Sequence, residues 1–319
     1  MNLMTILSII VSSMLVYSAP LIFTGLGGTF SERSGIVNVG LEGTMVIGAF
    51  VAIIFNLQTA SIFGGATPWI ALVVAGLAGV VFSCVHALAT VNFRVDHIVS
   101  GTVMNMLAPA LAIFLTRMLF DKKEQTDIIV ENFGKTTFPI LSDIPIIGPI
   151  FFKDTSAPAY LAILVAVLCY FILFKTKFGL RLRSVGEHPQ AADTLGINVY
   201  VMRYAGVLVS GFLGGVGGAV VAQSITLNFA HNTIVGQGFI AMAAMIFGKW
   251  NPIGVMFSAL LFGLAQSLGV VGSYIPVIQD IPSVWLNIAP YIITIVVLVG
   301  FIGKAEGPAA NGTTYVKSK

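Results

Sequence analysis

Glu42 is the side chain of this sequence best placed for chemistry, because it is the only acidic residue in the middle of an apolar run. A carboxyl group inside a membrane-spanning segment is energetically costly and commonly marks a pathway for a solute or ion. Asn38 lies four residues earlier, so in a helix the two side chains would share one face. Two interpretations stay open: a polar strip facing a translocation path, or a hydrogen bond that holds helices together.

A second group of polar side chains lies around the short apolar segment 234–248. Asn228, His231 and Gln237 are uncharged donors and acceptors, which suit a neutral, hydrogen-bonding solute better than an anion. A solvent-exposed loop would have the same composition, so this interpretation also stays open. We predict a substrate path lined by Asn38, Glu42, Asn228, His231 and Gln237.

The sequence lacks the motifs of several other kinds of site. His188 and His231 have no second His, Cys or acidic residue at metal-ligand spacing, so no metal site is expected. The P-loop pattern G-x-x-x-x-G-K-[ST] is absent, so the chain is not expected to bind ATP itself. Nothing in the sequence resembles a Ser-His-Asp nucleophile array. We therefore expect neither an enzyme nor a cofactor bound to this chain.

The composition predicts an all-α polytopic membrane protein forming one transmembrane domain over 1–319. Of the 319 residues, 57% are apolar and 9% are charged, and the mean hydropathy is +0.96, which leaves too little charge for a water-facing surface. The continuous runs long enough to cross the bilayer are 4–24, 69–91, 98–120, 158–174, 204–222, 252–270 and 284–302. Two interrupted runs, 36–56 and 234–248, give nine transmembrane helices, or ten if one Gly-rich stretch is split.

The distribution of charge predicts the orientation in the membrane. Segment 175–203 carries five basic and two acidic residues, so the positive-inside rule places it in the cytoplasm. Segment 121–157, with four basic and six acidic residues, is then external, and the tail 303–319 is cytoplasmic. The N-terminus lies outside with nine spans and inside with ten. Because the basic residues lie at membrane edges, we expect lipid and no nucleic acid as a partner.

The order of the segments predicts an inverted internal repeat. In each half an apolar helix is followed by a Gly-rich stretch, at 25–28 and at 214–218. An interrupted segment and then a helix beginning at Pro68 or Pro252 come next. With nine spans the corresponding helices cross in opposite directions, and repeats of this kind place the substrate path at their interface.

Two motifs resemble those of permease subunits of ATP-binding-cassette importers, in the family of branched-chain amino acid, ribose and nucleoside permeases. The nucleoside branch is the more similar, and its signature is matched by Glu32, Arg33, Ser34, Gly35, Asn38, Gly40, Leu41, Glu42 and Gly43. The run 179–198 resembles the cytoplasmic "EAA" segment, which in such permeases lies in a groove of the ATPase. The resemblance extends over nearly the full length of the chain.

This resemblance implies a permease subunit of an ATP-driven importer of purine and pyrimidine nucleosides, in a bacterial-type cell membrane. The implied partners are a cytoplasmic ATP-binding-cassette ATPase that binds the ATP, a second related permease subunit, and an external substrate-binding lipoprotein received by 121–157. Pro189 and Gly196 would bound a short coupling helix. The residues implied in ATPase coupling are Arg181, Arg183, Glu187, Pro189, Ala191, Ala192, Asp193 and Gly196.

Two alternatives remain at this point. Within the same family, the chain could be a permease for a sugar or a branched-chain amino acid. Outside it, the chain could be a stand-alone secondary transporter, in which Glu42 would be the proton or sodium site.

Overall fold

A computed structural model describes residues 3–139, 141–145, 147–271 and 306–317, together with positions 285, 288 and 292. In these ranges every regular element is a helix, and the only β pairing consists of two isolated bridges. The α-helices are α1 (Leu3–Arg33), α2 (Leu41–Phe63), α3 (Thr67–Ala87), α4 (His97–Leu119), α5 (Ala157–Lys175), α6 (Lys177–Glu187), α7 (Pro189–Thr194), α8 (Val199–Val221), α9 (Gln237–Phe247) and α10 (Pro252–Val271). The short helical turns are η1 (Gly64–Ala66), η2 (Leu88–Asn92), η3 (Gly148–Phe152) and η4 (Ala222–Thr226).

Six helical stretches in the described residues are long and apolar enough to cross a membrane. The longest, 41–92, has 52 residues and contains both α2 and α3, which fold back on each other at η1. A straight helix of that length would measure roughly 78 Å, far more than the roughly 30 Å hydrocarbon core. The prediction of an all-α polytopic membrane protein is confirmed, while the predicted span 284–302 falls outside the continuously described residues.

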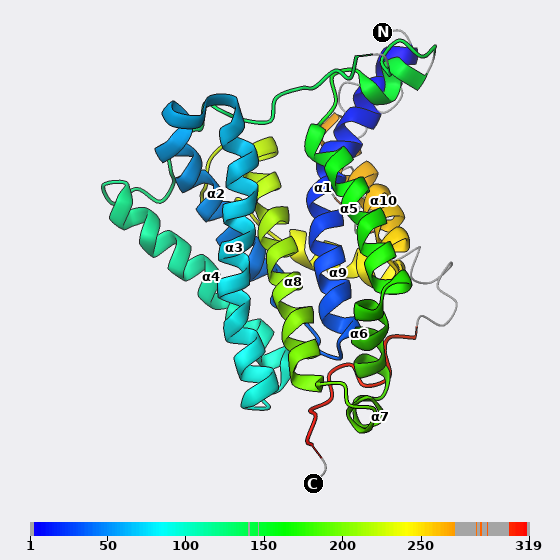
Figure 1. Cartoon of the computed structure of the whole chain (residues 1–319). Helices are drawn as coiled ribbons and strands as arrows, with labels where there is room; N and C mark the ends of the chain where they lie inside the picture. Colours follow the sequence, from blue (N-terminus) through cyan, green and yellow to red (C-terminus); the bar gives the residue numbers. More distant parts are fainter. Residues whose placement is uncertain are drawn as a thin grey trace.

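Helix α8 lies at the centre of the molecule (Figure 1). It packs against α2 and α3 on one side and against α1 on the other, and α5 and α10 cover the far side of α1. A Cβ atom added at Gly48 of α2 would lie 2.1 Å from the carbonyl oxygen of Gly215 in α8. The helix backbones therefore touch, which is how small residues allow close packing where no hydrophobic effect drives helices together.

The Gly-rich stretches 25–28 and 214–218 lie inside α1 and α8, so our expectation that they follow these helices is wrong. Glycine is tolerated there because each stretch faces a packed neighbour: a Cβ at Gly218 would lie 1.9 Å from the carbonyl oxygen of Met45. Their role is thus close helix contact.

The two halves of the chain do run in opposite directions. In Figure 1, α1 begins at the end marked N, whereas α8 begins beside α7 at the opposite end. Each is followed by a turn, by α2 or α9, and by a helix with a proline in its first turn, Pro68 in α3 and Pro252 in α10. This order supports the predicted inverted repeat, although α2 has 23 residues and α9 only 11.

The segments predicted to be external lie at one end of the molecule, and those predicted to be cytoplasmic lie at the other end. At the N-terminal end, the hydroxyls of Ser8 and Ser12 donate to the carbonyl oxygens of Pro149 (3.0 Å) and Asp154 (2.8 Å), in the predicted external segment. At the other end, the tail segment 306–317 lies against α6 and α7 (Figure 1). In the described residues, the start of α1 and the tail segment 306–317 lie at opposite ends of the molecule, an arrangement that agrees with the nine-span prediction.

Candidate functional site

Glu42 lies in the first turn of α2 and binds the first turn of α9. Its two carboxylate oxygens accept hydrogen bonds from different backbone N–H groups, those of Gly236 and Gly238, both at 2.5 Å. Gly236, with φ 78°, is the N-cap residue directly before α9. The positive ends of two helix dipoles therefore meet, and the one carboxylate stabilises both. This geometry supports the hypothesis that Glu42 holds helices together.

We expected Asn38 and Glu42 to share a helical face. They do not, because α2 begins only at Leu41 and Asn38 precedes it. Its side-chain oxygen accepts from the N–H of Gly40 (3.0 Å), and its amide donates to the hydroxyl of Ser210 in α8 (3.0 Å). Asn38 is thus a buried turn residue that fastens the start of α2 to α8.

The other three predicted path residues lie at two different levels. Gln237 is in the first turn of α9, next to the Glu42 contact, and pairs with Gln266 of α10 (3.5 Å). Asn228 and His231 lie farther along toward the predicted external surface, on the loop between η4 and α9. The backbone of Phe229 in this loop accepts from Thr126 (2.9 Å) of the predicted external segment. The structure therefore places Gln237 beside the residues that bind Glu42 and leaves Asn228 and His231 on an outer loop.

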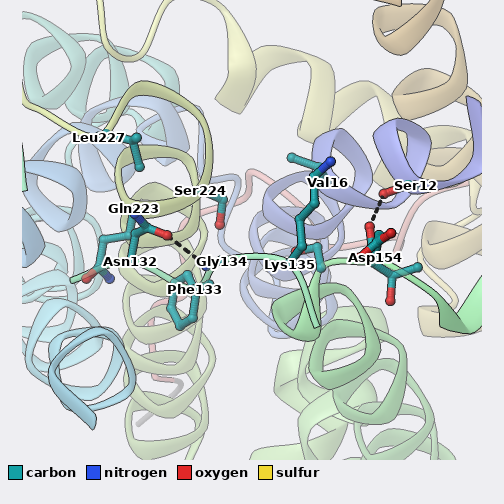
Figure 2. Close-up of a pocket in the computed structure, with 12 residues that line it drawn as sticks. Ser12, Val16, Asn132, Phe133, Gly134, Lys135, Asp154, Gln223, Ser224 and Leu227 are labelled. Atoms are coloured by element: carbon teal, nitrogen blue, oxygen red, sulfur yellow. Dashed lines mark hydrogen bonds between the residues drawn. The ribbon is translucent and has the colours of Figure 1, made fainter. Parts of the chain in front are cut away.

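A cavity of about 220 Å³ lies at the same end of the molecule (Figure 2). Its walls come from the upper part of α1, from η4, and from residues 132–135 and 154–156 of the predicted external segment. The cavity is lined by Ser12, Val16, Asn132, Phe133, Gly134, Lys135, Asp154, Thr155, Ser156, Gln223, Ser224 and Leu227. Most of its polar groups are hydroxyls and amides, which form hydrogen bonds with neutral solutes.

Two residues of η4 contribute polar side chains to the wall of this cavity. The side chain of Gln223 is fixed at both ends, accepting from Asn56 (2.9 Å) and donating to the carbonyl oxygen of Pro68 (3.3 Å). The hydroxyl of Ser224 is buried and has no hydrogen-bond partner in the part of the chain that the structure describes. We did not predict this cavity, because its residues come from four distant parts of the sequence with no common spacing.

The predicted coupling segment forms two helices at the opposite end. Helix α7 begins at Pro189, as predicted, and Gly196 follows its end with φ 80°, its N–H donating to the carbonyl oxygen of Asp193 (2.9 Å). The side chain of Arg183 donates to the carbonyl oxygen of Leu173 (3.0 Å) and lies 4.6 Å from the centre of the Phe174 ring. Arg183 therefore anchors α6 to the end of α5.

The faces of α6 and α7 divide the predicted coupling residues. Ala192 is buried together with Val185 and Val199 against Tyr315 of the tail, so it holds the two helices in place. Arg181, Glu187, Ala191 and Gly196 are exposed, whereas Asp193 is partly exposed. Burial, and then the nearby Asp193 carboxylate, raise the pKa of the Tyr315 hydroxyl to about 12. Tyr315 is therefore uncharged at neutral pH.

Leu195 is a coupling-segment residue that our sequence reasoning missed. Its side chain is 81% exposed, directly after α7 and at the tip of the polar end of the molecule. This exposure leaves the Leu195 side chain free to contact a partner protein. The available signal was a lone apolar side chain between Thr194 and Gly196.

Comparison with known proteins decides the family. A model of the branched-chain amino acid transport system permease component matches residues 10–303. This chain belongs to that permease family. Over all 319 residues, and over the whole of each relative, it is 61% identical to the nucleoside ABC transporter permease protein NupC of Lactococcus lactis and 56% identical to the guanosine ABC transporter permease protein NupQ of Bacillus subtilis.

A more distant member of the family is the putative glucose ABC transporter permease protein TsgC13 of Haloferax volcanii. It is 31% identical over 252 residues, which are 78% of this chain and 73% of the relative. Membership in the family and the apolar helices make this chain a multi-pass protein of the cell membrane.

Proposed function

We propose that this chain is a permease subunit of an ATP-binding-cassette importer that translocates nucleosides, purine and pyrimidine, into the cell. The observation that carries the proposal is its end-to-end identity of 61% and 56% with relatives named as nucleoside and guanosine permeases. The hydroxyls and amides that line the cavity between α1, η4 and the external segment, beside the charged Lys135 and Asp154, can form hydrogen bonds with an uncharged solute.

In this proposal α6 and α7 face the cytoplasm and contact a partner ATPase, which binds and hydrolyses the ATP. The exposed face that carries Glu187, Ala191 and Leu195 makes this contact, while Arg183 and Ala192 hold the two helices in place. Closure of the ATPase on ATP shifts the permease between inward-facing and outward-facing populations, because the two states present the α6–α7 surface differently.

The remaining proposed partners follow from the same family. A second, related permease completes the pore, and an external substrate-binding lipoprotein delivers the solute to segment 121–157. His231 supports a role for this surface, because it lines an open depression of about 410 Å³ together with Lys123, Glu124 and Gln125 of that segment.

The geometry argues against an ion-coupled transporter driven through Glu42. Each oxygen of Glu42 accepts from a backbone N–H group at the start of α9, at 2.5 Å, so a cation bound by this carboxylate would compete with that contact on every transport cycle.

Competition for uptake tests the substrate class. Cells that express this permease with its partner subunits, in a strain deleted for its own nucleoside permeases, should accumulate radiolabelled guanosine. Excess unlabelled adenosine, inosine or uridine should compete, while glucose, ribose and leucine should not. Inhibition by glucose or leucine, with none by nucleosides, would assign the chain to another substrate class in the family.

A further inference from the structure

The end of α1 is the meeting point of four segments that are far apart in sequence. They are the end of α1 itself (32–35), the end of α6 (186–187), the turn between α9 and α10 (248–251) and the tail (309–312). We call this cluster the basal junction. Its contacts lie on the same side of the molecule as the proposed ATPase surface (Figure 1).

Glu32 connects α1 to both the turn and the tail. Its side chain is 5% exposed, and a single carboxylate oxygen accepts from the indole N–H of Trp250 (2.6 Å) and from the amide of Asn311 (2.9 Å). A buried carboxylate is stable only when such donors replace water. Glu32 therefore fixes Trp250 and Asn311 with respect to α1.

Arg33 connects the same turn to α6. Its guanidinium donates to the carbonyl oxygens of Trp250 (3.1 Å) and Lys249 (3.4 Å), and lies 3.7 Å from the carboxylate of Glu187. The other oxygen of Glu187 accepts from the N–H of Ala309 (3.1 Å). An arginine with five fixed donors suits a position that binds several segments at once.

Close backbone packing stiffens the cluster. A Cβ atom at Gly186 would lie 2.2 Å from the carbonyl oxygen of Arg33, so the end of α6 rests directly on the end of α1. The tail adds two backbone hydrogen bonds, from Ala310 to Gly186 (2.9 Å) and from Gly312 to Gly35 (3.1 Å). A displacement of α6 should therefore also move the end of α1 and the tail.

The turn held by the junction is strained. Lys249 and Trp250 have φ values of 53° and 51°, in the left-handed region that costs non-glycine residues energy. From this turn α9 runs back for 11 residues, roughly 16 Å, to the Glu42 contact. Hydrogen bonds therefore hold α9 at both ends. Glu32 and Arg33 bind the turn that follows it, and Glu42 binds its first turn.

We propose that the basal junction passes the movement of α6 and α7 to α9, with Glu32, Arg33 and Trp250 as positioning residues and the tail as a clamp. This inference rests on the proposed function, because it assumes that an ATPase moves α6 and α7. Helix α9 then acts as a lever between the junction and the start of α2, where the two halves of the chain meet.

The test compares uptake with ATP hydrolysis in the complete transporter. Trp250→Phe keeps an aromatic ring but removes the indole N–H donor to Glu32 together with part of the ring system, and Trp69→Phe removes the same atoms elsewhere. We expect the complex to assemble and hydrolyse ATP, while the nucleoside taken up per ATP falls by about fivefold or more, because a hydrogen bond to a buried charge is lost. Trp69→Phe is the matched control, since Trp69 is on α3 at the opposite end and packs edge-on to Phe133.

A pair of changes at Glu32 provides a second test. Because both donors bind the same oxygen, Glu32→Gln can keep both hydrogen bonds through its amide oxygen and should remain coupled, whereas Glu32→Ala should uncouple as Trp250→Phe does. The inference fails if Trp250→Phe stays fully coupled, or if uptake and hydrolysis fall together in proportion to the assembled complex. Lack of ATP-dependent nucleoside uptake by the unaltered transporter would instead reject the proposed function.

Discussion

The carboxylate of Glu42, at the start of α2, accepts a hydrogen bond of 2.5 Å from the backbone N–H of Gly238, at the start of α9. The other carboxylate oxygen accepts from the N–H of Gly236, so each oxygen of the side chain binds a backbone donor. The first turns of two helices from opposite halves of the chain are thus joined by a single residue. A substitution that changes either the charge or the shape of residue 42 should therefore alter the position or stability of α9.

Glu42→Gln should destabilise the protein even though it preserves the shape of the side chain. Glutamine supplies one acceptor oxygen and places an NH2 group against the second backbone N–H, which leaves a buried donor unsatisfied at a cost of about 1–3 kcal/mol. Thermal unfolding of the purified complex should show a lower midpoint and uptake should fall. Glu306→Gln, the same change at an exposed site, should have neither effect. An unchanged midpoint for Glu42→Gln would contradict the contact described here.

Helix packing at α8 predicts a contrast between two glycines. Gly48→Ala places a methyl group 2.1 Å from the carbonyl oxygen of Gly215, so the helices must separate, at a cost of about 1–3 kcal/mol. Gly65→Ala meets no atom within 4 Å and should change stability by less than about 0.5 kcal/mol. The yield and thermal stability of the two variants in detergent would measure the difference. Equal stability of the two would show that α2 and α8 are not in backbone contact.

The orientation in the membrane can be measured by labelling single cysteines. In a variant with Cys84 and Cys169 replaced by Ala, a cysteine at Gln125 should react with an impermeant maleimide in intact cells. A cysteine at Leu195 should react only after permeabilisation, because it lies at the opposite end of the molecule. The reverse pattern would invert the topology and remove the ATPase from the α6–α7 surface.

Leu195→Asp should weaken association with the ATPase without affecting the fold, because the side chain is exposed and packs against little of the chain. We expect the amount of co-purified ATPase to fall by about tenfold or more if Leu195 is an anchor of the contact. Val316→Asp, an exposed apolar residue on the tail, serves as the control and should keep the ATPase bound. Normal co-purification of the ATPase with Leu195→Asp would exclude this residue from the contact.

Local signals in the sequence predicted the helices and the boundaries of the coupling segment. Pro189 and Gly196 act through their own backbone preferences, so α7 could be placed without knowledge of its neighbours. The partners of Glu42 could not be predicted, because Gly236 and Gly238 bind through their backbone, which carries no residue-specific signal. The basal junction was missed for a related reason: its residues become neighbours only after the chain has crossed the membrane several times.

Transport by purified components in vesicles tests the central claim most directly. Proteoliposomes that contain this permease, the second permease and the ATPase, supplied with the external binding protein, should take up guanosine only when ATP is present on the ATPase side. A proton or sodium gradient without ATP should drive no uptake. Guanosine uptake driven by such a gradient in vesicles that contain this chain alone would contradict the assignment as an ATP-driven importer permease.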